Sequence, residues 1–192
     1  MFSRRRARVS YVLRFALVVV AASLPFPAFA DVSFTVNAPT RPRVEATPSG
    51  DRVVVEGSGW DVVREPGLPE LPFRVVNVLL PQGSAPDDIV VTASAPRRIG
   101  AGVHPMLAEP YATNEGDIVP PSATFDASAT YPATHARLMG VGYWHGYAIA
   151  TVAVYPFALA NGELSVVDRI DVTVPTHIAD TAPVAREVEI AA

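Results

Sequence analysis

The segment GVGYWHGYAIATVAVYPFALANGELSVVDRIDVTVP, residues 140–175, decides the fold of this chain of 192 residues. It holds two apolar runs, at 147–155 and 164–174, and Asn161-Gly162 lies between them. An Asn-Gly pair adopts positive φ angles at little cost, so it is a typical reversal point. The segment predicts two strands that pair with each other. The stretch before the reversal is longer than a two-residue turn, so we expect a loop around Phe157 and Leu159.

The second run alternates in the way a half-buried strand does. Ile170, Val172 and Val174 occupy every second position, and the residues between them are polar or charged. Successive side chains of a strand point to opposite faces, so this pattern predicts one dry face and one wet face.

The rest of the chain predicts an all-β protein. Runs at 31–37, 52–56, 73–80 and 89–95 are rich in Val, Ile and Phe and end in Gly or Pro clusters, whereas no apolar helical period is present after residue 30. Three prolines between residues 65 and 72 predict an extended surface crossing. From residue 96 to 134 Pro, Gly, Ala and Ser predominate, and we expect a long irregular loop there. The fold class is therefore a β-sandwich of antiparallel strands with one long loop.

The first thirty residues have the composition of a secretory signal peptide. Five arginines precede or enter a short apolar run at 15–24, and Ala28-Phe29-Ala30 is a small-x-small cleavage sequence. We expect cleavage after Ala30, a sandwich domain over residues 31–175, and a linker or tail over 176–192. The expected location is the periplasm, the cell surface or the medium, without membrane attachment after cleavage.

Charge and cysteine content narrow the function classes. After residue 30 the chain has 10 arginines against 19 acidic residues, a net charge of −9, which opposes binding to nucleic acid. The chain has no cysteine, so it contains neither a disulfide nor a cysteine nucleophile. We expect no cofactor.

Two short motifs resemble the propeptide domain of gingipain-type cysteine peptidases. One is the aromatic strand that ends in Tyr155-Pro156-Phe157, followed by Asn161-Gly162-Glu163-Leu164 and the strand 168–174. The other is the Pro-rich segment 65–72, followed by a Val-rich strand and the turn 80–83. The resemblance covers residues 44–174.

The resemblance implies a non-catalytic sandwich that assists the folding of a cysteine peptidase domain and inhibits it, in the same chain or in another. In Arg-specific members of the family an exposed loop arginine occupies the specificity pocket of the peptidase. Arg97 and Arg98, at the start of the expected loop, and Arg137, near its end, are the candidates for that role here. The catalytic domain of the family is not present in these 192 residues.

Other residues carry weaker signals. Tyr143, Trp144 and Tyr147 form an aromatic group that either contacts a partner or packs into the core. Arg186 is a candidate processing site. The four histidines lack metal-ligand spacing, so we expect no metal site, although acidic pairs such as Asp87-Asp88 leave calcium as an alternative.

The sequence thus favours a secreted prodomain that binds a cysteine peptidase. The alternative is an exported adhesion or structural sandwich that binds a surface partner. A hydrolase is disfavoured because no set of nucleophile, base and orienting residue is present in the sequence.

Overall fold

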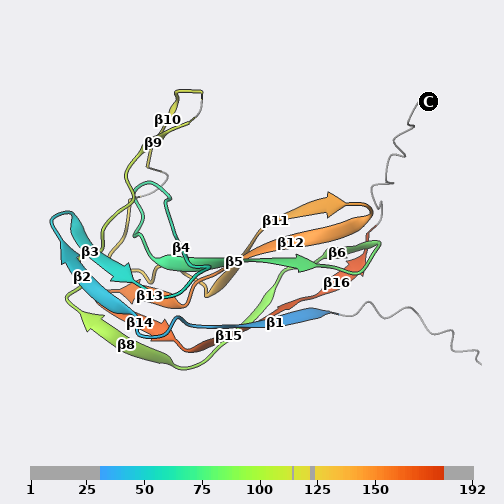
Figure 1. Ribbon diagram of the computed structural model, residues 1–192, viewed down its shortest axis with the longest axis horizontal. Coiled ribbons are helices and arrows are strands. Elements are labelled where there is room, and N and C mark those ends of the chain that lie inside the picture. Colours follow the sequence, from blue (N-terminus) through green and yellow to red (C-terminus); the bar gives the residue numbers. More distant parts are fainter. Residues whose placement is uncertain (1–30, 114, 122–123, 180–192) are drawn as a thin grey trace, which may run out of the picture.

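The computed structural model describes residues 31–113, 115–121 and 124–179 (Figure 1). These residues form sixteen strands and no helix, which confirms the predicted all-β fold. Within them, no helix of the length and hydrophobicity needed to cross a membrane is present. The strands are β1 (Val32–Asn37), β2 (Arg43–Thr47), β3 (Gly50–Val54), β4 (Asp61–Val62), β5 (Pro72–Leu79), β6 (Ser84–Pro86), β7 (Val90–Ala93), β8 (Pro96–Ala101), β9 (Tyr111–Ala112), β10 (Ile118–Val119), β11 (Ala136–Trp144), β12 (Tyr147–Val154), β13 (Phe157–Ala160), β14 (Glu163–Val167), β15 (Arg169–Val174) and β16 (Thr176–Ile178).

All strand pairs are antiparallel, and they divide the sandwich into two halves along its length (Figure 1). In one half the four-stranded sheet β11-β12-β5-β4 lies over the sheet β1-β15-β7. The other half contains the sheet β13-β14-β8 and the hairpin β2-β3. The strand β16 pairs with β6, so strand structure continues past residue 175.

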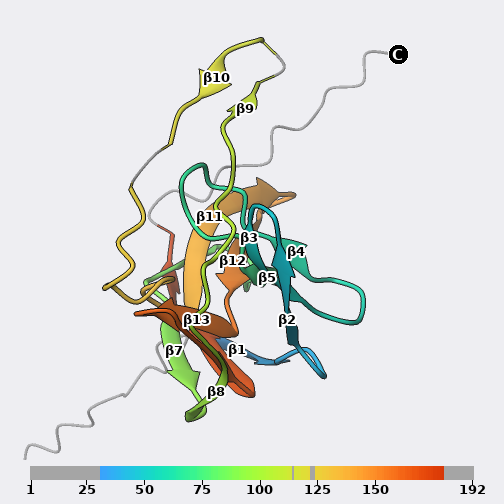
Figure 2. The ribbon, with the colours of Figure 1, turned by 90° about the vertical axis from the view of Figure 1, so that its left-hand side faces the viewer.

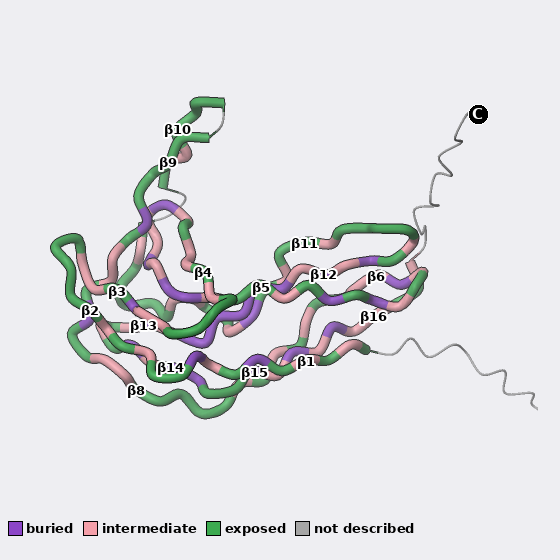
Figure 3. Tube along the Cα trace, viewed as in Figure 1, coloured by how far each residue is buried: buried purple, intermediate pink, exposed green. Residues whose placement is uncertain are grey.

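The first half has a core of aliphatic side chains between its two sheets. Alternate residues of β12 and β15 meet there, and Val152, Val154, Ile170, Val172 and Val174 are each fully buried. The predicted buried face of 170–174 is thus confirmed, and the opposite face of this strand is turned toward solvent. Figure 3 shows buried residues of β15 alternating with half-buried ones.

The second half has its own core. Phe157 and Leu159 of β13, Leu164 and Val166 of β14, and Val53 of β3 form a second buried cluster. The expected loop around Phe157 and Leu159 is therefore wrong, because these side chains alternate inward as strand residues do. The turn at Asn161-Gly162 is confirmed: both residues have positive φ, 51° and 71°, and they join β13 to β14.

The run 164–174 is two strands, which corrects the predicted pairing with 147–155. The chain changes sheets at Asp168, so β14 pairs with β13 and β8 while β15 pairs with β1 and β7. The strand β12 pairs instead with β11 and β5. Ser94 fixes the change of sheet, since its hydroxyl accepts hydrogen bonds from the backbone N–H groups of Asp168 and Arg169 at 3.0 and 3.2 Å.

Two other expectations are corrected. The long loop does not begin at residue 96, because residues 96–101 form β8 at an edge of its sheet, and β9 and β10 lie further along. The Pro-rich segment 65–72 does not simply cross the surface: Leu71 is 2 % exposed, and Pro69 is among the fully buried side chains. An isolated bridge from Pro69 to Leu107 shows that the following chain covers it.

Candidate partner-binding surface

A hairpin arm stands out from the sandwich (Figures 1 and 2). It consists of β9 and β10, in which Tyr111 pairs with Val119 and Ala112 with Ile118. Near its end the backbone N–H of Thr113 donates to the carbonyl oxygen of Asp117 at 2.7 Å. The described residues of the arm are mostly exposed (Figure 3), so the arm extends the sandwich outward rather than adding to a core.

The root of the arm is fixed by backbone hydrogen bonds to the Pro-rich segment. The N–H of Ala108 donates to the carbonyl of Leu68, and the N–H of Gly67 donates to the carbonyl of Ala108, both at 2.9 Å. The N–H of Glu70 donates to the carbonyl of Met106 at 2.9 Å. The prolines that keep this segment extended thus leave its remaining N–H and C=O groups free to hold the arm.

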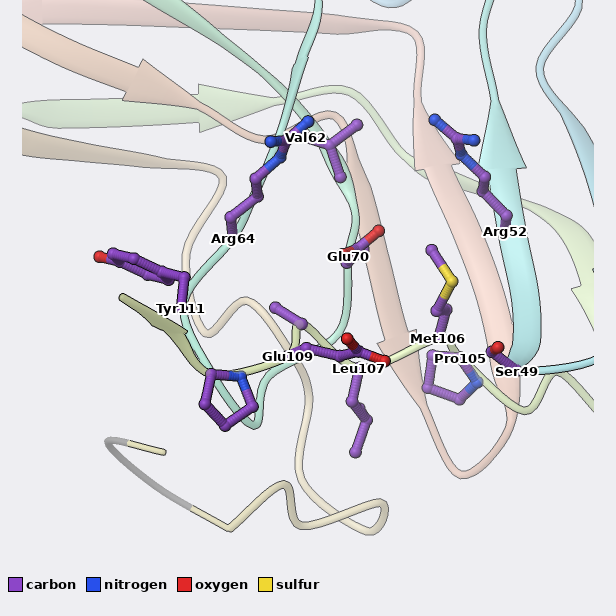
Figure 4. Close-up of a pocket in the computed structure, with 12 residues that line it drawn as sticks. Ser49, Arg52, Val62, Arg64, Glu70, Pro105, Met106, Leu107, Glu109 and Tyr111 are labelled. Carbon is purple, nitrogen blue, oxygen red and sulfur yellow. The ribbon is translucent and has the colours of Figure 1, made fainter. Parts of the chain in front are cut away.

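A groove of about 1050 Å³ lies beside the arm root (Figure 4). Arg52 and Arg64 line opposite sides of it, and Glu70 lies between them. Met106 and Tyr111 contribute apolar surface to the same groove. Its charges are of both signs, so it lacks the concentrated positive charge that an anion site needs.

The three candidate arginines lie on strands and not on a loop, which corrects their expected placement. Arg97 and Arg98 belong to β8, and each has a carboxylate partner: Asp168 at 3.4 Å from Arg97 and Glu163 at 3.7 Å from Arg98. These pairs are exposed, so each contributes little to stability. Both guanidinium groups remain accessible to a partner.

Arg137 belongs to β11 and lies where the arm meets the four-stranded sheet. It lines a pocket of about 300 Å³ together with Met139 of the sheet, Tyr155 just after β12, and Tyr111 and Val119 of the arm. Arg137 and Arg97 therefore lie on different sheets of the molecule.

Tyr131, near Arg137, has a perturbed hydroxyl. Burial raises the pKa of Tyr131 to about 12, and the negative charge of Glu65 adds to the increase, while the positive charge of Arg137 acts in the opposite direction. Tyr131 is therefore a neutral hydrogen-bonding group throughout the physiological pH range and is not a general base.

The predicted aromatic group lies at the end of the β11–β12 hairpin and is exposed. Trp144 is 66 % exposed, Tyr143 51 % and Tyr147 37 %. The alternative, that these rings pack into the core, does not describe the structure. Trp144 makes an edge contact with His145, with ring centroids 4.6 Å apart.

The other sequence-predicted sites receive no chemical support from the described residues. No group of three His, Asp or Glu side chains in them is arranged to hold a metal. Asp87 instead forms a pair with His177 at 2.8 Å. The processing candidates Ala30 and Arg186 lie outside the described residues.

Sequence reasoning missed the apolar residues that lie beside the aromatic group. Val75 and Leu79 of β5 and Met139 of β11 are all more than 40 % exposed. A signal was present in residues 73–80, FRVVNVLL, which is apolar on both faces of the strand rather than on one.

Comparison with known proteins identifies the fold. The sequence matches no protein-family profile and no curated protein. Among solved structures, the chain is similar to one from the complex of the pro- and mature domains of RgpB from Porphyromonas gingivalis, with a TM-score of 0.53, 13% identity, and coverage of 77% of this chain and 80% of that chain. It is also similar to one from a structure that addresses the zymogenic latency of gingipain K from Porphyromonas gingivalis, with a TM-score of 0.54, 18% identity, and coverage of 81% and 97%. At this level of identity the likeness is one of fold: the chain shares its fold with chains from these two gingipain structures.

Proposed function

We propose that this chain is a secreted, non-catalytic prodomain that binds a gingipain-type cysteine peptidase domain, assists its folding and keeps it inactive. The observation that carries the proposal is the shared fold with chains from a pro- and mature-domain complex and from a study of a latent zymogen. The absence of cysteine from the chain is consistent with a non-catalytic role. The N-terminal segment supports export.

Inhibition by this chain requires contact with the peptidase through exposed groups. Arg97, Arg98 and Arg137 are the proposed contacts with a specificity pocket, because a guanidinium can form a bidentate, desolvated pair with a carboxylate there. The arm cannot supply such a group itself, since no Arg or Lys occurs from residue 99 to 136. Arg137, at the arm root, is the candidate closest to a projecting element.

The test is inhibition of mature RgpB and mature gingipain K by the exported chain, that is, residues 31–192. We expect wild-type protein to inhibit at least one of them, and one of Arg97→Ala, Arg98→Ala and Arg137→Ala to raise the inhibition constant at least tenfold. Circular dichroism would confirm that each variant is folded. If folded wild-type protein neither inhibits nor binds either enzyme, the prodomain proposal is wrong.

The exposed aromatic rings favour one other function, that of an exported adhesion or structural module. Tyr143, Trp144 and Tyr147 would then contact a surface partner directly. That function predicts binding to a cell surface or its glycans without any effect on peptidase activity.

A further inference from the structure

One face of the sheet β11-β12-β5 carries several exposed apolar side chains, although Ala153 on the same face is buried. Register places Leu79 opposite Ile149 and Trp144 opposite Tyr147, all on the face turned away from the buried core residues. The apolar side chains exposed on this face, which we call the floor, are Val75, Leu79, Met139, Trp144 and Tyr147, with exposed fractions of 42, 59, 53, 66 and 37 %.

The five residues of the floor carry no charge. Asn77 and Thr151 lie at its centre, and there the Thr151 hydroxyl donates to the Asn77 side-chain oxygen at 3.0 Å, so these polar groups satisfy each other. Gly140 and Gly142 of β11 share this face, and a Cβ added at either would meet no atom within 4 Å. The outer face of a sandwich sheet is ordinarily polar, and a contiguous apolar patch on such a face marks an interaction site.

The arm forms a wall beside the floor. Tyr111 and Val119 of the arm line the same pocket as Met139 and Arg137 of β11, so the wall and the floor meet in a corner, which Arg64 and Glu65 also line. Ile118 pairs with Ala112 and therefore lies on the other face of the arm. In Figure 1 the arm stands out on the side of the sandwich that carries β11, and not on the side of β15. Floor, corner and wall together make an angular surface, with its apolar side chains on the floor and its charged ones at the corner.

The position of Ala179, the last described residue, adds a second argument. The N–H of Ala179 donates to the carbonyl of Gly83 at 3.0 Å, and the N–H of Gly83 faces the carbonyl of Gly146 at 3.5 Å. Gly146 lies in the turn between Trp144 and Tyr147. A domain that followed residue 192 would therefore be tethered to a point beside the floor, and the tether would raise its effective concentration there.

We infer that the floor and wall are the docking surface for the convex, apolar face of a globular peptidase domain, with Arg137 as the charged contact at the corner. This inference rests on the proposed function and specifies which surface performs it. A folded domain fits better than an extended peptide, because the floor spans three strands and is wider than a single peptide strand. The contact would exclude water from the floor, and its aromatic residues would carry most of the binding energy.

The experiment measures binding of exported variants to catalytically inactivated mature RgpB and gingipain K domains. Leu79→Ser with Trp144→Ser removes apolar contacts from the floor, and Tyr111→Ser removes one from the wall. We expect each change to raise the dissociation constant at least tenfold. Val90→Ser and Ile118→Ser are matched controls, because both residues are exposed and apolar, at 57 and 72 %, but lie away from the floor and corner. We expect both controls to stay within twofold of wild type.

The outcomes separate the two proposals. If wild-type protein binds and the floor and wall variants bind equally well, the inference is wrong while the prodomain function stands. If folded wild-type protein binds neither enzyme, both fail. Sedimentation velocity of the free protein tests self-association: a wild-type dimer that the floor variant abolishes would assign this surface to a second copy and overturn the inference.

Discussion

The two cores are expected to unfold as one cooperative unit, and Phe157→Ala tests this most sharply. Phe157 is fully buried in the second core, so its truncation should cost about 3 to 5 kcal/mol of unfolding free energy. For a domain of this size that corresponds to a fall in Tm of about 6 to 20 °C. Ile170→Ala, in the first core, should cost about 2 to 5 kcal/mol.

Cooperativity is expected because the chain crosses between the cores several times. Strands β14 and β15 are separated only by Asp168, and the N–H of Val167 donates to the carbonyl of Pro156 at 2.9 Å where β12 gives way to β13. Calorimetry of the exported protein should therefore show one transition, lowered by either substitution. Val90→Ala, at an exposed position, serves as the control and should leave Tm nearly unchanged. Two transitions, of which Phe157→Ala lowers only one, would refute the reasoning.

Three further predictions concern the backbone and pH. Gly50→Ala should be more destabilising than Gly57→Ala in chemical denaturation. Both glycines have positive φ, but only at Gly50 would a Cβ lie 2.9 Å from the backbone nitrogen of Met106. Equal losses of unfolding free energy in the two variants would contradict this prediction. Asn161→Val should cost about 1 to 2 kcal/mol and Asn161→Gly much less, since the residue has φ 51°; an equal loss in both would show that the side chain rather than the backbone matters. Hydrogen bonds from Arg169 and Thr35 lower the pKa of Asp171 from 3.8 to about 2, so the stabilising contribution of this carboxylate is complete above pH 4 and is lost as pH falls to 2. The difference in unfolding free energy between wild type and Asp171→Asn should therefore shrink over that interval. A difference that does not change with pH would count against this prediction.

The fold class was predictable because it depends on local patterns. Alternation at Ile170, Val172 and Val174 and the turn at Asn161-Gly162 act within a few residues, and both are confirmed. Strand pairing was not predictable, because it depends on which distant segment offers a partner. Asp168 interrupts the apolar alternation of the run 164–174, but this local mark does not say which sheet each half joins; that depends on distant partners such as Ser94, 74 residues away in sequence.

The same distinction explains which parts of the surface the sequence revealed. Trp144 and Tyr147 stand out in the sequence as aromatic residues, but their exposure depends on the absence of a covering layer of structure, which no local sequence pattern predicts. Val75 and Leu79 lie in a Val-rich strand whose sequence does not distinguish its two faces, and only the register opposite Ala153 and Ile149 assigns them to the outer face. A strand that is apolar on both sides needs two partners in space, and this sandwich provides only one of them. In the prodomain that we propose, the second is the peptidase.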